Sequence, residues 1–196
     1  MQELPRHNSP FCTGESLYAY TVFYRAKPHL QKLRRREQSG FTSHRSRVDR
    51  IATLKLIWQR RRELQKPFWV AYVYFRSAFD SVDRKALWLL LEYRAGIPQK
   101  LTDLMEDLYT VSCVQTNGVQ SDRFPFSAEV RQGCNITPNL FLEPIDWIIN
   151  RTIHRVLAGV SFGGETFTDL DFANDVTLLS EILEMLIISL EIMHYL

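Results

Sequence analysis

The clearest periodic pattern of apolar and polar positions lies between residues 47 and 65. Apolar side chains recur there at the three- and four-residue spacing of one helix face: Val48, Ile51, Leu54 and Trp58. Ser46 stands before this run and Asp49 follows three residues later, a pairing typical of a capping box. Because Pro67 cannot continue a helix, the pattern predicts an amphipathic helix over 47–65.

An unbroken apolar run follows this predicted helix. The stretch "FWVAYVYF" at 68–75 has no polar alternation, which predicts a strand buried on both faces. Asp80 or Ser81 can then cap a second helix, which Gly96 and Pro98 close.

The second half of the chain alternates helix and hairpin signals. A third helix is predicted over about 98–109, and Asn117-Gly118 is a strong signal for a β-hairpin. A glycine turn then leads into a long helix. The stretch "DLDFANDVTLLS" at 169–180 has two β-prone runs separated by a polar turn, and a last helix follows. Mixed strands and helices of this kind predict an α+β fold.

The charge of the chain is unevenly distributed. The net charge is only +2, but residues 1–66 carry 15 Lys and Arg against 5 Asp and Glu, whereas residues 67–196 carry 9 against 17. A basic first third indicates a polyanionic partner such as nucleic acid. A solvated basic face without a partner is the alternative.

Cysteines and apolar segments exclude several classes of protein. The three cysteines are scattered and form no CxxC pair, which argues against a disulfide framework or a zinc site. The first residues lack the apolar core of a signal peptide, and glutamates interrupt the most apolar segment, near the C-terminus. We therefore expect a soluble intracellular protein, in the cytoplasm or nucleus, without membrane association. The oligomeric state is left open.

Four stretches, in this order and spacing, carry a resemblance to a known family. They are "EQSGFTSHRSRVDRI", "VAYVYFRSAFDSVDR", "VRQGCNITPNLF" and "TDLDFANDVTLL". Together they resemble the reverse transcriptase domain of non-LTR (LINE-type) retrotransposons, from about Arg25 to Leu196. The resemblance implies a right-hand polymerase core with an antiparallel palm sheet flanked by helices. It implies basic fingers over 25–66 and a palm over 67–196, with neither thumb nor endonuclease. Residues 1–24 precede the resemblance and are a poorly defined segment, in which Pro5, Pro10 and Gly14 break any periodicity.

The same resemblance implies a metal site and shows where this sequence departs from it. The family transfers nucleotides with two Mg²⁺ ions, held by one carboxylate on the first palm strand and two on the hairpin. The matching positions here are Tyr74, Asn174 and Asp175, so only Asp175 keeps a carboxylate. We expect the palm to form nonetheless, with Tyr74 beside the 174–175 turn. We predict an RNA-directed DNA polymerase by descent that is catalytically inactive and does not bind Mg²⁺ productively. Asp80 and Asp171 are not expected to replace the lost carboxylates.

Other family roles map onto further residues. The resemblance assigns nucleotide binding to a short set: Phe79, Arg131, Gln132 and Gly133. It assigns contact with an RNA or DNA template-primer to basic residues of the fingers: Arg34, Arg35, Arg36 and Arg45. Ser43 and Glu129 depart from the family pattern, and a carboxylate at Glu129 would repel a nucleotide's phosphates. Two alternatives to a polymerase remain: a weak, sequence-blind nucleic-acid-binding remnant, and a retroelement fragment with no selected function.

Overall fold

The structure is a computed structural model that describes residues 13–75, 81–112, 115–116, 119–122, 124–125, 136–156 and 158–196. The chain divides into two compact units. Unit 1 comprises Met1–Leu33 and Ser77–Glu143, and unit 2 comprises Arg34–Arg76 and Pro144–Leu196. The long helix α5 (Thr137–Val156) begins in the first unit and continues into the second.

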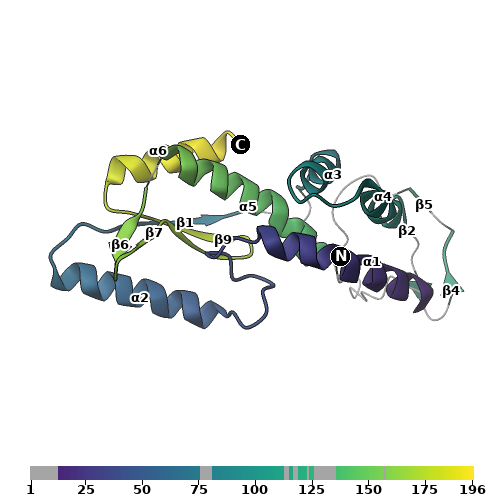
Figure 1. Ribbon diagram of the computed structural model, residues 1–196, viewed down its shortest axis with the longest axis horizontal. Helices are drawn as coiled ribbons and strands as arrows, with labels where there is room; N and C mark the ends of the chain where they lie inside the picture. Colours follow the sequence, from purple (N-terminus) through teal and green to yellow (C-terminus); the bar gives the residue numbers. More distant parts are fainter. Residues whose placement is uncertain are drawn as a thin grey trace, which may run out of the picture. The chain divides into compact units, whose positions relative to one another are not determined.

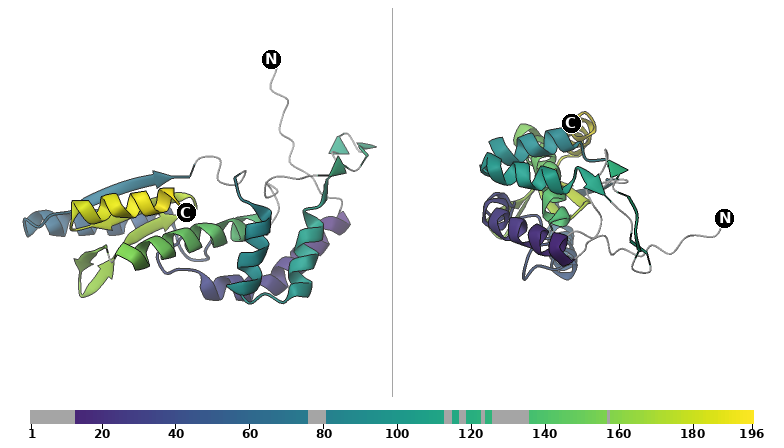
Figure 2. Two further views of the ribbon diagram at one scale, coloured as in Figure 1. Left: turned by 90° about the horizontal axis from the view of Figure 1, so that it is seen from above. Right: turned by 90° about the vertical axis from the view of Figure 1, so that its right-hand side faces the viewer.

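Unit 1 is built from helices around one apolar cluster. Helices α1 (Thr13–Leu33), α3 (Arg84–Tyr93) and α4 (Gln99–Leu108) lie together with the start of α5 (Figure 2). Their fully buried side chains include one from each helix: Leu30, Leu91, Met105 and Leu140. The buried Tyr109 ring meets Trp88 edge to face, and its hydroxyl is hydrogen-bonded to Thr137 at 2.8 Å. The ring is thereby packed and its polar end is satisfied.

Three sequence expectations for unit 1 have clear outcomes. Helix α1 was not predicted: it begins inside the poorly defined segment 1–24, continues to Leu33 and contains Pro28. The N-cap of α3 is Asp83, whose carboxylate accepts from the Ala86 amide at 3.0 Å, so the prediction of Asp80 or Ser81 is wrong. The predicted hairpin at 117–118 is confirmed, because β3 (Gln115–Thr116) pairs with β4 (Val119–Gln120). A second pairing joins β2 (Val111–Ser112) to β5 (Phe124–Pro125).

Unit 2 contains a three-stranded antiparallel sheet between helices. The strand order is β1 (Trp69–Tyr74), β9 (Asp175–Ser180) and β8 (Asp169–Phe172). Helix α2 (Arg47–Glu63) covers part of one face, and α6 (Leu183–His194) lies against the other (Figure 1). A separate hairpin joins β6 (Val160–Phe162) to β7 (Glu165–Phe167).

Helix α2 confirms the predicted N-terminus and corrects the predicted buried face. The Ser46 hydroxyl accepts from the Asp49 amide, and the Asp49 carboxylate accepts from the Ser46 amide, which completes the capping box. The side chains buried on this helix are Ile57 and Arg61. Of the four residues predicted to share the apolar face, Leu54 packs against the core, but Val48, Ile51 and Trp58 are exposed, so that part of the prediction is wrong. The helix is rotated so that Ile57 joins a cluster with Val160, Leu170 and Leu179.

Strand β1 also differs from its prediction. A strand buried on both faces was expected, but Trp69, Tyr72 and Tyr74 are exposed. Two causes act together. β1 is an edge strand with one neighbour, and α2 covers only the start of its even-numbered face, where Val70 packs against the cluster that contains Ile57.

The three remaining helices agree with expectation. The helix predicted over about 98–109 is α4, the predicted long helix is α5, and the predicted last helix is α6. In the described part of the chain, no helix has both the length and the apolar character needed to cross a bilayer.

Candidate active site at the β8–β9 hairpin

The turn between β8 and β9 lies beside the end of β1. Tyr74 pairs directly with Asp175, and Asp175 pairs on its other side with Phe172. Ala173 and Asn174 form the two-residue loop, and the Phe75 amide donates to the Asn174 carbonyl oxygen at 3.4 Å. The predicted juxtaposition of Tyr74 with the 174–175 turn, 100 positions away in sequence, is therefore confirmed.

The register of the strands determines which side chains share a face. Directly opposed residues of antiparallel strands project to the same side of the sheet. Tyr74, Asp175 and Phe172 therefore share one face, and Asp171 and Asp169 project from the other because side chains alternate along β8. Tyr74 and Asp175 are exposed, so the only carboxylate at this turn is open to solvent.

A buried glutamine holds the hairpin turn. The Gln38 amide nitrogen donates to the Ala173 carbonyl oxygen at 3.3 Å, and its oxygen accepts from the Ala173 amide at 2.8 Å. The same oxygen accepts from the Gly40 amide at 2.8 Å. Ala173 has φ +58°, a left-handed conformation that alanine adopts at a cost of about 1–2 kcal/mol. These bonds hold the turn in that conformation.

Gly40 lies against the same turn. A Cβ added at Gly40 would stand 2.3 Å from the Ala173 nitrogen and 2.7 Å from its Cα. Only glycine permits the backbones to approach this closely. Sequence reasoning placed Gln38 and Gly40 within a family motif but missed their role, because their partner lies more than 130 residues later.

The segment before Gly40 is also paired with β8. The Ser39 amide donates to the Asp171 carbonyl oxygen at 2.9 Å, and the Asp171 amide donates to the Glu37 carbonyl oxygen at 3.1 Å. These bonds form a parallel bridge between Gln38 and Asp171. Residues 37–40 therefore extend the sheet at the β8 edge and fix the position of the hairpin.

An ion-pair network lies on the sheet face opposite Tyr74. The Arg35 guanidinium contacts the Asp169 carboxylate at 2.7 Å and the Asp171 carboxylate at 3.1 Å, and both carboxylates are fully buried. Burial raises the pKa of Asp171 well above its ordinary value, and the neighbouring Asp169 raises it further, whereas Arg35 lowers it. Burial would lower the pKa of Arg35, but Asp169 and Asp171 raise it overall. Asp171 is thus engaged with Arg35 and faces away from Asp175.

The four arginines predicted to bind nucleic acid lie in two different environments. The side chains of Arg34 and Arg35 are 7% and 9% exposed, and Arg34 is 3.6 Å from the Asp146 carboxylate. Arg36 and Arg45 are exposed, and the Arg45 guanidinium donates to the Arg36 and Gln38 carbonyl oxygens. Two of the four arginines are therefore in internal ion pairs, and two are on the surface.

The residues predicted to bind nucleotide lie outside the described residues: Phe79, Arg131, Gln132 and Gly133. Asp80 and Glu129 lie outside them as well. Their assignments stay predictions.

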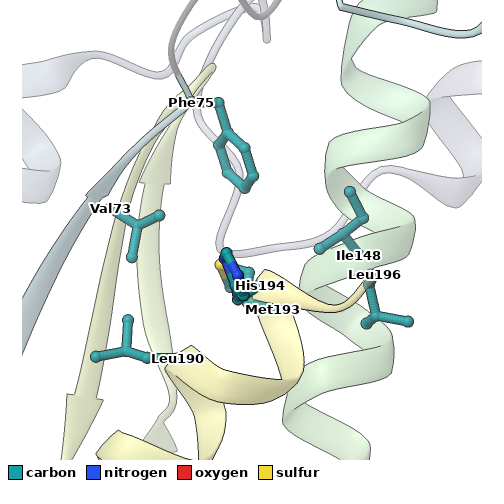
Figure 3. Close-up of a pocket in the computed structure, with 7 residues that line it drawn as sticks. All are labelled: Val73, Phe75, Ile148, Leu190, Met193, His194 and Leu196. Carbon is teal, nitrogen blue, oxygen red and sulfur yellow. The ribbon is translucent and has the colours of Figure 1, made fainter.

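An apolar cavity lies on the α6 side of the β1 end. It has a volume of about 440 Å³. Figure 3 shows its lining from β1, α5, α6 and the C-terminal residue: Val73, Phe75, Ile148, Leu190, Met193, His194 and Leu196. Val73 projects from the face opposite Tyr74, so this cavity is distinct from the candidate active site.

Comparison of the sequence with models of known protein families identifies its family. The model of the family "Reverse transcriptase (RNA-dependent DNA polymerase)" matches residues 20–195, nearly the whole chain. The chain belongs to the reverse transcriptase family. No curated protein matches the chain.

Reverse transcriptases use divalent metal ions, and the hairpin residues here do not fit such a site. The three positions predicted from the resemblance to match the family's ligands, Tyr74, Asn174 and Asp175, provide a phenol, an amide and one carboxylate. Mg²⁺ prefers anionic oxygens in near-octahedral geometry, and a pair of ions needs several of them. Within the described ranges, no group of three or more His, Cys, Asp or Glu side chains is arranged to hold a metal.

Proposed function

We propose that this chain is a reverse transcriptase domain of the non-LTR (LINE-type) class that has lost polymerase activity. One observation carries the proposal. Tyr74, on β1, pairs with Asp175, on β9, and the turn residue that precedes Asp175 is Asn174. The strand register supports the assignment of these positions to the ligand positions of the family. The fold is thus kept while two of the three carboxylates are replaced.

The replacements remove charge where the reaction needs it. A phenol has an ordinary pKa of about 10, so tyrosine is neutral at pH 7. Asparagine can offer one neutral oxygen but no negative charge. Metal ions contribute several kcal/mol of transition-state stabilisation, and each 1.4 kcal/mol is about tenfold in rate. Loss of two ligands of three therefore reduces the rate by orders of magnitude.

Primer extension tests this proposal. The full chain is incubated with oligo(dT) annealed to poly(rA), dTTP and either Mg²⁺ or Mn²⁺. Asp175→Asn serves as the matched control, because it removes the last carboxylate with little change in shape. We expect no extension by the parent chain above that of the control. Extension clearly above the control would contradict the proposed loss of activity.

A second candidate function is sequence-blind nucleic-acid binding, favoured by the surface positions of Arg36 and Arg45. Binding of this kind depends on counterion release, with log K falling by about 0.7–0.9 per phosphate contact for each decade of salt. We expect weak, micromolar-class affinity. Joint substitution of Arg36 and Arg45 by alanine should weaken binding to all sequences and flatten the salt dependence. Joint substitution of Lys55 and Lys66 by alanine is the control, and it should change both less.

Arg34 and Arg35 are left unchanged in this experiment, because their loss would perturb the internal ion pairs. Fluorescence anisotropy on a single strand and on a hybrid duplex, repeated over a range of salt concentrations, measures both the affinity and its salt dependence. An absence of binding at low salt would favour the remaining alternative, a retroelement-derived chain with no selected function.

A further inference from the structure

Three aromatic side chains lie on the same face of the unit 2 sheet. Tyr72 and Tyr74 are two residues apart on β1, and their exposed fractions are 75% and 67%. Phe172 of β8 lies across Asp175 from Tyr74 and is half-buried. Residues two apart on a strand project to the same side at a spacing of about 6.7 Å. We name Tyr72, Tyr74 and Phe172 the aromatic face.

A cationic edge borders the aromatic face. The guanidinium carbon of Arg47, the first residue of α2, lies 5.5 Å from the centre of the Phe172 ring. Arg36 and Arg45 are exposed in the loop that leads to α2. Arg50 donates to the Arg36 carbonyl oxygen at 2.7 Å and so ties this loop to α2. One guanidinium, that of Arg47, is therefore held beside a ring of the aromatic face, and two more arginines lie on the loop before α2.

Three carboxylates lie in the same region. Glu37 is 3.7 Å from the Arg35 guanidinium, Asp49 is committed to the capping box, and Asp175 projects between Tyr74 and Phe172. A lipid surface or an apolar protein partner would bury Asp175 without a cation opposite it, which is unfavourable. An unpaired nucleic-acid strand would leave this carboxylate in solvent while its bases contact the rings. The composition of the surface thus favours a nucleic-acid ligand.

Exposed rings and adjacent guanidiniums suit the chemistry of single strands. Bases of any sequence stack on aromatic side chains, and nearby cations contact the phosphates. We propose that the aromatic face and Arg47 bind single-stranded nucleic acid by base stacking, without a metal ion. The inference rests on the second candidate function, nucleic-acid binding, and assigns it a site, in which Tyr74 has a binding role at the position that the resemblance gives to a metal ligand.

Fluorescence anisotropy tests the proposal on the full chain at low salt, in EDTA and without nucleotides. The probe is a fluorescein-labelled oligo(dT) single strand, with an abasic strand of the same length as comparison. We expect Tyr72→Ala and Tyr74→Ala each to weaken binding about 5- to 150-fold. Tyr72→Phe and Tyr74→Phe should retain binding, because stacking needs the ring and not the hydroxyl.

Matched variants separate stacking from other effects. Tyr93→Ala removes a tyrosine of unit 1 that is 85% exposed, and it should leave affinity unchanged. Arg47→Ala should reduce the salt slope by about 0.7, the value of one phosphate contact on a single strand. The abasic strand should bind the parent chain at least about fivefold more weakly than oligo(dT).

Several results would overturn the proposal. Equal affinity for abasic and normal strands would show that only the cations act. Retained affinity in both alanine variants, or a loss in Tyr93→Ala as large as theirs, would also refute base stacking at the aromatic face. Because no metal or nucleotide is present, the result is independent of the primer-extension test. Polymerase activity of the parent chain would overturn the proposed loss of activity but not this binding site.

Discussion

The close approach of Gly40 to the hairpin turn predicts a large effect of adding one carbon atom. In Gly40→Ala the new Cβ would stand 2.3 Å from the Ala173 nitrogen, 2.7 Å from its Cα and 2.9 Å from its Cβ. Ordinary contacts begin at 3.4 Å, so the overlap with the nitrogen is about 1 Å. Two of the three atoms are backbone atoms and cannot rotate away.

The turn also cannot shift without breaking hydrogen bonds. Movement of Ala173 away from residue 40 would separate it from the Gln38 amide, which bonds both its nitrogen and its oxygen. A buried group left without a partner costs about 1–3 kcal/mol, and overpacking alone costs about the same. We therefore expect Gly40→Ala to lower the free energy of unfolding by about 3 kcal/mol or more. In a chain of this size that lowers Tm by about 6–12 °C.

Urea denaturation followed by tryptophan fluorescence measures the effect, since Trp58 and Trp69 both lie in unit 2. Gly163→Ala is the matched control. Gly163 has φ +62° and no atom within 4 Å of an added Cβ, so only backbone strain of about 1–2 kcal/mol is expected there. Gly40→Ala should be clearly less stable than Gly163→Ala. Equal stability of the two variants would refute the steric explanation.

Three further predictions follow from the site. Arg35→Met leaves two buried carboxylates without their cation and should destabilise the chain by about 3–5 kcal/mol. Arg60→Met, which breaks an exposed ion pair, should cost less than about 1 kcal/mol. Similar losses of stability for the two variants in thermal melts would contradict this prediction. Burial raises the pKa of Asp171 above its ordinary 3.8, so its contribution to stability is present below about pH 4 and is lost as pH rises through the raised pKa. Asp171→Asn should therefore gain stability relative to the parent as pH rises from about 4 through that raised pKa, by at most about 1.4 kcal/mol for each pH unit in urea titrations, and a difference independent of pH would argue against it. The double change Tyr74→Asp, Asn174→Asp should create Mn²⁺ binding detectable by electron paramagnetic resonance, whereas neither the parent chain nor Tyr74→Asp alone should bind comparably.

The part of the fold that sequence reasoning predicted rests on local signals or family motifs. The capping box of Ser46 and Asp49 needs only residues three apart, and its geometry follows from backbone chemistry. The contact between Tyr74 and Asp175 spans 101 positions, and it was predicted because two motifs of one family imply a shared sheet. Neither prediction required knowledge of how the helices pack.

The errors concern side chains whose environment depends on distant partners. Arg34 and Arg35 stand in a basic run that suggests a solvated surface, but carboxylates from α5 and β8 surround them. The apolar run of β1 suggests complete burial, but Tyr72 and Tyr74 lie beyond the reach of the α2 cluster. A single sequence does not show how much of a sheet a helix covers, so the exposure of Tyr72 and Tyr74 could not be predicted without the structure.

The hydrogen bonds of Gln38 have a consequence for how this domain can change over evolutionary time. Apart from the strand pairing itself, the turn is held by the Gln38 side-chain amide and by the close contact with Gly40, and no hydrogen bond from the side chains of Tyr74, Asn174 or Asp175 to the turn is among its described contacts. Selection on foldability and selection on chemistry therefore act on different amino acids. A lineage released from the need to copy nucleic acid can accept new residues at the solvent side and still inherit a domain that folds.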